Sequence, residues 1–115
     1  MYVLTVLRES VDPGEHVDVP LEKRLAVDDG DVLQDVVTRI VDNDFLAGGG
    51  DAAWVLASSK RRLAVFCRQW KAPCFLVPQE SPILAWIVPG DRWQLYFSYL
   101  QGTDPEVVYR RLKQP

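Results

Sequence analysis

Chemically reactive side chains are scarce in this sequence of 115 residues, which contains one histidine and two cysteines. His16 follows an Asp-Pro-Gly turn, and no serine or cysteine motif supplies it with a partner for base catalysis. Cys67 and Cys74, even together with His16, are too few for the four ligands of a structural zinc site. We therefore expect two reduced thiols, no resident metal and no cofactor.

Long apolar runs are also missing. No apolar stretch reaches the roughly 20 residues that a membrane-spanning helix requires. The opening MYVLTVLRES has no basic start and is interrupted by Arg8 and Glu9, so we expect no signal peptide. The glycine-rich stretch at 47–51 lacks the lysine of a P-loop. These absences predict a cytoplasmic protein that does not bind membranes and is not an enzyme.

The composition is that of a folded protein with an uneven distribution of charge. Apolar residues make up 48% and charged residues 25% of the chain, which predicts a single globular domain over residues 1–115. Residues 1–50 contain eleven Asp/Glu and four Lys/Arg, whereas residues 51–115 contain five and nine. A chain with a net charge of −3 thus has an acidic first part and a basic second part, which favours a binding role.

The acidic part predicts two strands followed by a helix. Strand-forming residues fill 2–7, and a return strand is expected at 23–27. Asp31 is expected to cap the helix, with Gln34 completing a capping box. The spacing of one helical face is shown by Leu33, Val36, Val37 and Ile40.

The basic part predicts two hairpins. Residues 52–70 are expected to form a strand, a polar turn at 58–61 and a second strand. Residues 83–101 are expected to form a strand, a Pro-Gly-Asp turn at 89–91 and a last strand. Alternation in that last strand places two sets of side chains on opposite faces, namely Trp93, Leu95, Phe97 and Tyr99 against Arg92, Gln94, Tyr96 and Ser98.

Two shorter elements complete the prediction. A short strand is expected at 74–77, and a C-terminal helix over 103–114 begins at Thr103 or Asp104. The expected fold class is α+β. It has a single, mostly antiparallel or mixed sheet of five to seven strands, one helix packed after the second strand, and a short C-terminal helix.

Residues 1–46 resemble the opening of the β-grasp fold of ubiquitin-like proteins. The residues that carry the likeness are Leu25, Val27, Asp31, Leu33, Val36, Arg39 and Ile40. The resemblance implies a strand–strand–helix unit, here extended by further sheet. The chain ends in Lys-Gln-Pro rather than in a di-glycine tail, so conjugation is not implied. A weaker likeness, in size, acidity and order of elements, is to bacterial immunity proteins, which bind and neutralise toxins.

The function that these features favour is non-enzymatic protein binding, in its most concrete form an immunity-type inhibitor whose acidic surface docks on a basic partner protein. Some aspartates near the helix N-terminus have a structural reason, because the helix dipole favours acids there. The acidic candidates for the partner surface are Asp28, Asp29, Asp35, Asp42 and Asp44. Arg92 and Tyr96 are added because these residue types are enriched at binding hot spots, provided that the C-terminal helix leaves their face open. A homo-oligomer is also left open.

Two alternatives remain. A small nucleic-acid-binding domain would use the basic hairpin at 60–71, with phosphate contacts and base stacking from Lys60, Arg61, Arg62, Arg68 and Trp70. An enzyme with an acidic metal site would draw its carboxylates from Asp28, Asp29, Asp31 and Asp35.

Overall fold

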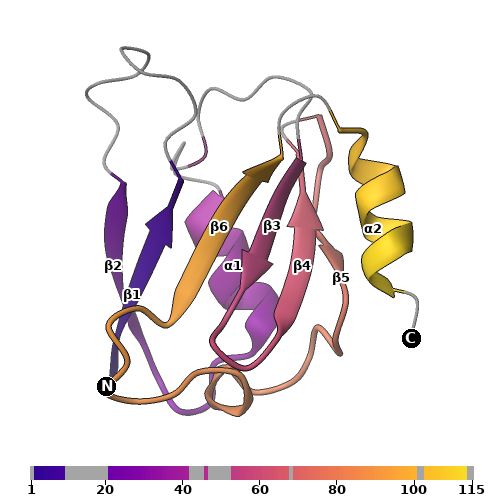
Figure 1. The fold of residues 1–115 in the computed structure, drawn as a ribbon. Helices are drawn as coiled ribbons and strands as arrows, with labels where there is room; N and C mark the ends of the chain where they lie inside the picture. The colour runs from indigo at the N-terminus through magenta and orange to yellow at the C-terminus, as the bar shows by residue number, and fades with distance from the viewer. Residues whose placement is uncertain are drawn as a thin grey trace.

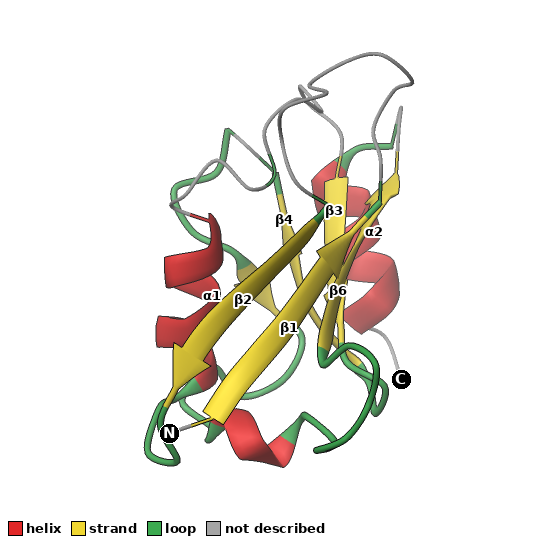
Figure 2. Cartoon of the chain, turned by 90° about the vertical axis from the view of Figure 1, so that its left-hand side faces the viewer, coloured by secondary structure: helices red, strands yellow, loops and turns green. Residues whose placement is uncertain are grey.

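The computed structural model describes residues 2–9, 21–41, 46, 53–67, 69–100 and 103–113. Their strands are β1 (Tyr2–Arg8), β2 (Glu22–Val27), β3 (Ala53–Ala57), β4 (Arg62–Phe66), β5 (Cys74–Phe75) and β6 (Leu95–Leu100). The helices are α1 (Leu33–Val41), the 3-10 turn η1 (Ile83–Ala85) and α2 (Pro105–Lys113). The strands form one six-stranded sheet in the order β2-β1-β6-β3-β4-β5, with α1 and α2 on opposite sides of it (Figures 1 and 2). The α+β fold with a single sheet and a short C-terminal helix is therefore as expected.

The sheet is mixed because of one pairing near its centre. β6 pairs with β1 in parallel and with β3 antiparallel, whereas the other neighbouring strands all run antiparallel. The side chain of Gln94 stabilises the β1–β6 pairing, because its amide oxygen accepts a hydrogen bond from the Thr5 N–H at 2.7 Å. The Gln94 backbone N–H donates to the Thr5 carbonyl at 3.0 Å. The first and last strands are thus joined in the middle of the sheet.

One face of the sheet carries the main core. The helical face predicted from the spacing of Leu33, Val36, Val37 and Ile40 is buried, with exposures of 1% or less. It packs with alternate strand residues such as Leu4, Trp54 and Phe97, each fully buried. Because valine is a modest helix former, this packing rather than intrinsic propensity stabilises α1.

The N-terminus of α1 differs from the expectation. Asp31 does not form the predicted capping box, because its carboxylate turns back to accept the Asp28 N–H at 2.8 Å and pairs with Arg39 at 3.0 Å. Two N–H groups at the start of the helix are instead satisfied by the loop at 79–81, which is distant in sequence. Leu33 donates to the Ser81 carbonyl and Gln34 to the Gln79 carbonyl, both at 2.9 Å. A backbone segment has therefore replaced a side-chain cap.

The first predicted hairpin is confirmed and the second is wrong. β3 and β4 flank the polar turn at 58–61 as expected, and a short β5 lies within 74–77. The expected strand at 83–88 is instead a loop with η1, in which Ile83 and Ile87 are buried and Leu84 and Ala85 are exposed. This spacing is that of a helical turn rather than of a strand. Ile83 is held by its N–H, which donates to the Asp31 carbonyl at 2.9 Å, and β6 pairs with β1 and β3 instead.

The turn before β6 is present, although the alternation does not extend as far as predicted. The Asp91 N–H donates to the Val88 carbonyl at 3.2 Å, and Gly90 adopts φ +91°, as the third position of a type II turn requires. β6 begins at Leu95, so Trp93 does not join Leu95 in the core. The Trp93 ring instead lies 5.6 Å from the ring of Tyr96.

α2 begins close to where the sequence predicts. The Asp104 side chain accepts the Glu106 N–H at 2.9 Å and so caps the helix. Val108 is buried against Ala53, Val55 and Val65, on the side of the sheet away from α1. Among the described residues, no helix has the length and apolar character needed to cross a membrane. The strand–strand–helix order of the opening is present, and the family likeness itself stays a prediction.

Candidate functional site

The second face of the sheet is only partly covered. Among the described elements, the main contacts of α2 are with β4 and β3, towards the β5 edge of the sheet (Figure 1). On the same face, the strand alternation places Val3, Leu7, Tyr96 and Leu100, which belong to β1 and β6. Val3 is 56% exposed and Leu100 is 38% exposed. We call these four residues the open face, because they present apolar surface beside a helix that does not cover them.

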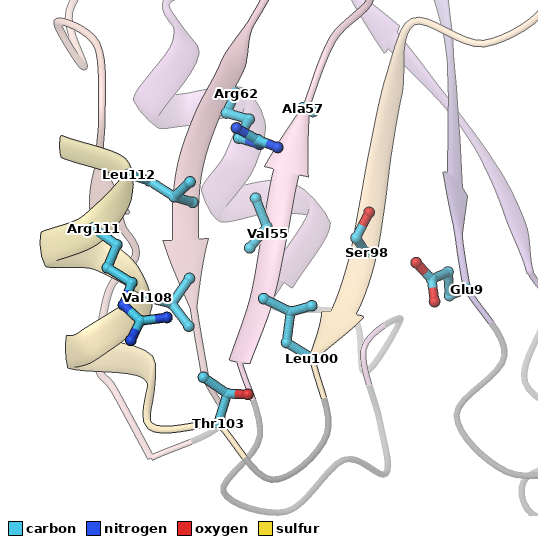
Figure 3. Close-up of a pocket in the computed structure, with 10 residues that line it drawn as sticks. All are labelled: Glu9, Val55, Ala57, Arg62, Ser98, Leu100, Thr103, Val108, Arg111 and Leu112. Atoms are coloured by element: carbon cyan, nitrogen blue, oxygen red, sulfur yellow. The ribbon is translucent and has the colours of Figure 1, made fainter. Parts of the chain in front are cut away.

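A groove of about 510 Å³ lies where the open face meets α2 (Figure 3). Its floor is formed by Val55 and Ala57 of β3 and by Ser98 and Leu100 of β6. Strand register explains this floor, because Val55 lies opposite Ser98 and therefore points to the same side of the sheet. The volume is in the range of protein binding sites, for which about 300–1,000 Å³ is typical.

The wall of the groove is provided by α2. Val108 and Leu112 project from the helix towards the floor, one turn apart on the same helical face (Figure 3). Val108 anchors the helix to the sheet, whereas Leu112 is half-buried. The apolar stripe of α2 is therefore shared between the core and the groove.

Three charged side chains border the groove. Arg62 of β4 and Arg111 of α2 lie on the helix side, and Glu9, directly after β1, lies on the opposite side (Figure 3). A register shift between Leu56 and Ala57 brings Arg62 opposite Ala57 and so onto the groove side of the sheet. Within the described residues, none of the three charges takes part in an ion pair. The groove thus has an apolar floor between two arginines and one carboxylate.

Tyr96 extends the apolar surface from the groove towards β1. Its register places it between Leu7 and Ala57, and its ring is packed against Trp93. Burial raises the pKa of the Tyr96 hydroxyl, and the nearby charge of Glu9 raises it further. Tyr96 therefore stays neutral at physiological pH and offers both an aromatic surface and a hydroxyl group.

The structure does not join Arg92 or the acidic candidates to this site. Arg92 is exposed in the loop before β6, where strand alternation no longer places it beside Tyr96. Asp28 and Asp29 are exposed after β2, and Asp35 is exposed on α1, behind the sheet as seen from the groove. Two further acidic candidates, Asp42 and Asp44, lie outside the described residues.

Arg39 neutralises part of the negative charge near the N-terminus of α1, because it pairs with Asp31 at 3.0 Å. The pKa of Asp31 is lowered, mainly by the hydrogen bond from the Asp28 N–H and further by the guanidinium group of Arg39. Asp28, Asp29 and Asp35 form no ion pair with other described residues. These three residues are therefore exposed carboxylates near α1 that have no cationic partner among the described residues.

The carboxylates near α1 do not assemble as a metal site would require. In the described part of the chain, no group of three or more His, Cys, Asp or Glu side chains is placed to hold a metal ion. Asp31, one of the four candidates, already uses its carboxylate for Asp28 and Arg39. The enzyme alternative has gained no support from this geometry and stays a prediction.

The candidate residues of the basic hairpin lie in different environments and do not share one surface role. Lys60 donates to the Ala85 carbonyl at 3.3 Å, and Arg62 borders the groove, whereas Arg61 is exposed. Trp70 is half-buried against the core cluster under α2, so part of its ring is used for packing. Arg68 lies outside the described residues. The nucleic-acid alternative likewise stays a prediction.

No protein-family model, curated protein or solved structure matches this chain. Its site is therefore interpreted from its own chemistry. Sequence reasoning named two residues of the groove and the open face, Arg62 and Tyr96. It proposed Tyr96 as a binding residue on the condition that the C-terminal helix leaves its face open. It missed Glu9, Leu100 and Arg111, because their proximity requires the β1–β6 pairing and the position of α2.

Proposed function

We propose that this chain is a non-enzymatic protein-binding domain whose open face and groove receive an apolar segment of a partner protein flanked by charged residues. The observation that carries the proposal is the groove floor around Leu100, which is 38% exposed and is bordered by Arg62, Arg111 and Glu9, none of which forms an ion pair with another described residue. Removing this floor from water is a favourable contribution to association, at about 25 cal/mol per Å² of apolar area.

The residue types on this surface support the proposal. Tyrosine, tryptophan and arginine are enriched among residues that dominate binding energies, and Tyr96, Trp93, Arg62 and Arg111 all belong to this region or border it. Charged groups around an apolar centre orient a partner and exclude wrong ones. An apolar centre within a polar rim is the usual arrangement of a protein interface.

Leu100→Asp tests this proposal, with Leu84→Asp as a matched control. Both leucines are 38% exposed, but Leu84 lies on η1 and does not line the groove. The wild-type protein and both variants are immobilised and exposed to lysate of the native host, and the captured proteins are quantified by mass spectrometry. We expect a partner that is retained by the wild type and by Leu84→Asp, and reduced about tenfold by Leu100→Asp.

Equal capture by the two variants would overturn the proposal, provided that thermal unfolding shows both to be folded. A photo-crosslinking residue at Ser98, on the floor of the groove, adds a positional test. The proposal requires that the same partner becomes crosslinked at this position.

An immunity-type inhibitor is the second candidate, and it is favoured by the exposed Asp28, Asp29 and Asp35. In this form, the three carboxylates steer a basic partner, such as a toxin with a cationic cleft, onto the side of the molecule that carries α1. Reversal of Asp28 and Asp35 to lysine would then weaken capture and remove its dependence on salt. Capture that is unchanged by the reversal, at both low and high salt, would exclude this candidate.

A further inference from the structure

We infer that the segment received by the groove is an amphipathic α-helix that lies beside α2, with acidic residues on the flank facing Arg62 and Arg111 and a basic residue on the flank facing Glu9. This inference rests on the proposed function, and it specifies the conformation and the charge pattern of the partner. It follows from the edges of the sheet, the nature of the floor, its dimensions and the charges on its two sides.

The edges of the sheet disfavour the other common mode of recognition, in which a peptide adds as a strand. The edge strand β2 carries Glu22, Lys23 and Arg24 in succession, and consecutive charges discourage pairing with another chain. At the other edge, the Tyr109 hydroxyl of α2 donates to the Phe75 carbonyl of β5 at 3.4 Å. The surface left for a partner is therefore the face of the sheet.

The floor of that face selects a helix. Val55, Ala57 and Leu100 offer side-chain carbon atoms and Ser98 adds a single hydroxyl group, whereas the backbones of β3 and β6 are paired with each other. An extended peptide lying on this floor would bury N–H and C=O groups without partners, which is costly. A helix satisfies these groups internally and can present a continuous apolar stripe.

The dimensions of the floor match one short helix. Arg62 on β4 and Glu9 next to β1 are separated by β3 and β6, so the charges stand three strand spacings apart, about 14 Å at about 4.8 Å per spacing. A helix with its side chains is about 10–12 Å wide. The six residues of β6 span about 20 Å, the length of about 13 helical residues.

The charges determine which helix fits. Arg62 and Arg111 border the side next to α2, and both are exposed and without an ion pair in the described residues. Glu9 borders the opposite side (Figure 3). Acidic residues at i and i+4 along one flank of a helix would lie near the two arginines, and a lysine on the other flank would lie near Glu9.

Three synthetic peptides of 18 residues test this inference by fluorescence anisotropy. The mixed peptide has a Leu stripe with i, i+3, i+4, i+7 spacing, a Glu row on one flank and a Lys row on the other. The scrambled peptide has the same composition without the stripe, and the basic peptide has the stripe with Lys on both flanks. We expect the mixed peptide to bind at least tenfold more tightly than either of the others, and more weakly at high salt.

The charge pattern is tested on the protein with Arg62→Glu/Arg111→Glu. This double variant should bind the basic peptide in preference to the mixed one. The control is Arg110→Glu, on the same helix but outside the groove, where the exposed Arg110–Glu106 contact of 3.8 Å contributes little. It should bind the mixed peptide as the wild type does.

The inference is overturned if the mixed peptide binds no more tightly than the scrambled or the basic peptide. It is also overturned if the chain forms a dimer that Leu100→Asp dissociates, because a second copy would then occupy the groove. A failure of the peptides while Leu100→Asp still loses the native partner would refute the helix and leave the protein-binding role in place. Failure of both experiments would remove the proposed function as well.

Discussion

The two faces of the sheet are built from the same strands but differ in how much of their apolar surface is buried. On one face, Leu4, Trp54 and Phe97 are completely buried under α1 and the segments around it. On the other, α2 covers β4 and β3, while Val3 and Leu100 remain 56% and 38% exposed. Alternation supplies apolar residues to both faces, so the difference comes from how much of each face a helix covers.

The comparison also separates stability from binding. The covered face contains the larger core cluster and is expected to dominate the free energy of unfolding. The open face keeps an apolar area in water, and the groove beside it is bordered by three charges that form no ion pair with other described residues. This arrangement contributes little to folding and is available for association. Substitutions at two positions of β6 whose side chains lie on opposite faces can therefore distinguish the two roles.

The largest expected effect comes from truncating Phe97, which is fully buried on the covered face of β6. Phe97→Ala should lower the free energy of unfolding by about 3–5 kcal/mol, because it removes a large side chain and leaves a cavity. Urea denaturation followed by tryptophan fluorescence measures this change. Leu100→Ala, three residues along the same strand and 38% exposed, should cost less than about 1 kcal/mol. Similar losses from the two variants would contradict the division between the faces.

A second prediction concerns Gln94, which joins the strands shared by both faces. In Gln94→Ala, the Thr5 N–H loses its 2.7 Å acceptor and the Asp91 carbonyl loses its 2.9 Å donor. The loss of these two part-buried hydrogen bonds should cost about 1–3 kcal/mol, at about 0.5–1.5 kcal/mol each. Hydrogen exchange should show the loss of protection concentrated at the β1–β6 pair. Loss of protection centred instead on β3 and β4 would argue against this role for Gln94.

A third prediction concerns Val108, which fixes α2 to the second face and is 6% exposed. Val108→Ala should destabilise the protein by about 1–2 kcal/mol, less than Phe97→Ala, because a smaller side chain is removed from a smaller cluster. Chemical denaturation gives the value. Leu112→Ala on the same helix serves as a control for the groove, since Leu112 is half-buried and its loss should affect binding more than folding. If Leu112→Ala destabilised the protein more than Val108→Ala, Leu112 rather than Val108 would be the residue that fixes α2 to the sheet.

The smallest expected effects are changes in the pH dependence of stability, and they differ between the faces. On the side of α1, the pKa of Asp31 is lowered in the folded protein, so its contribution is present above the unfolded pKa of about 4 and is lost as the pH falls through the folded value. On the open face, the pKa of Tyr96 is raised by burial. Its contribution is therefore present below the unfolded pKa of about 10 and is lost as the pH rises through the folded value.

Two conservative substitutions check this assignment. Asp31→Asn should flatten the acid limb of a stability–pH curve and leave the alkaline limb unchanged, whereas Tyr96→Phe should do the reverse. Thermal unfolding between pH 2.5 and 11 provides both limbs. An alkaline limb that persists in Tyr96→Phe would mean that another group accounts for it.

Much of the architecture was predictable from short windows of the sequence. Period-2 and period-3.6 patterns located β1, β2, β3, β4 and the buried face of α1. Turn chemistry located the bend at Gly90 and the cap at Asp104. These features depend on interactions within a few residues of each other, and so they are encoded where they occur.

The predictions failed where another group took the hydrogen-bond partner that the local pattern assumes. Residues 83–88 have the apolar content of a strand, but the loop that contains them supplies carbonyls to the N-terminus of α1 and leaves β6 to pair with β1. Asp31 has the sequence of a helix cap, but its carboxylate is taken by Asp28 and Arg39. Local propensity was overridden by distant segments at residues 83–88, and by a competing partner three residues before Asp31 and another on α1 itself at the helix cap.

The sequence by itself determined which stretches form strands and helices and which of their sides are apolar, because side-chain spacing fixes these properties locally. The tertiary structure decided that β1 and β6 lie side by side, that α2 covers part of one face, and that Glu9, Arg62 and Arg111 surround a groove. Those outcomes depend on which long-range pairing satisfies the most backbone groups and buries the most apolar surface, a comparison that involves the whole chain at once.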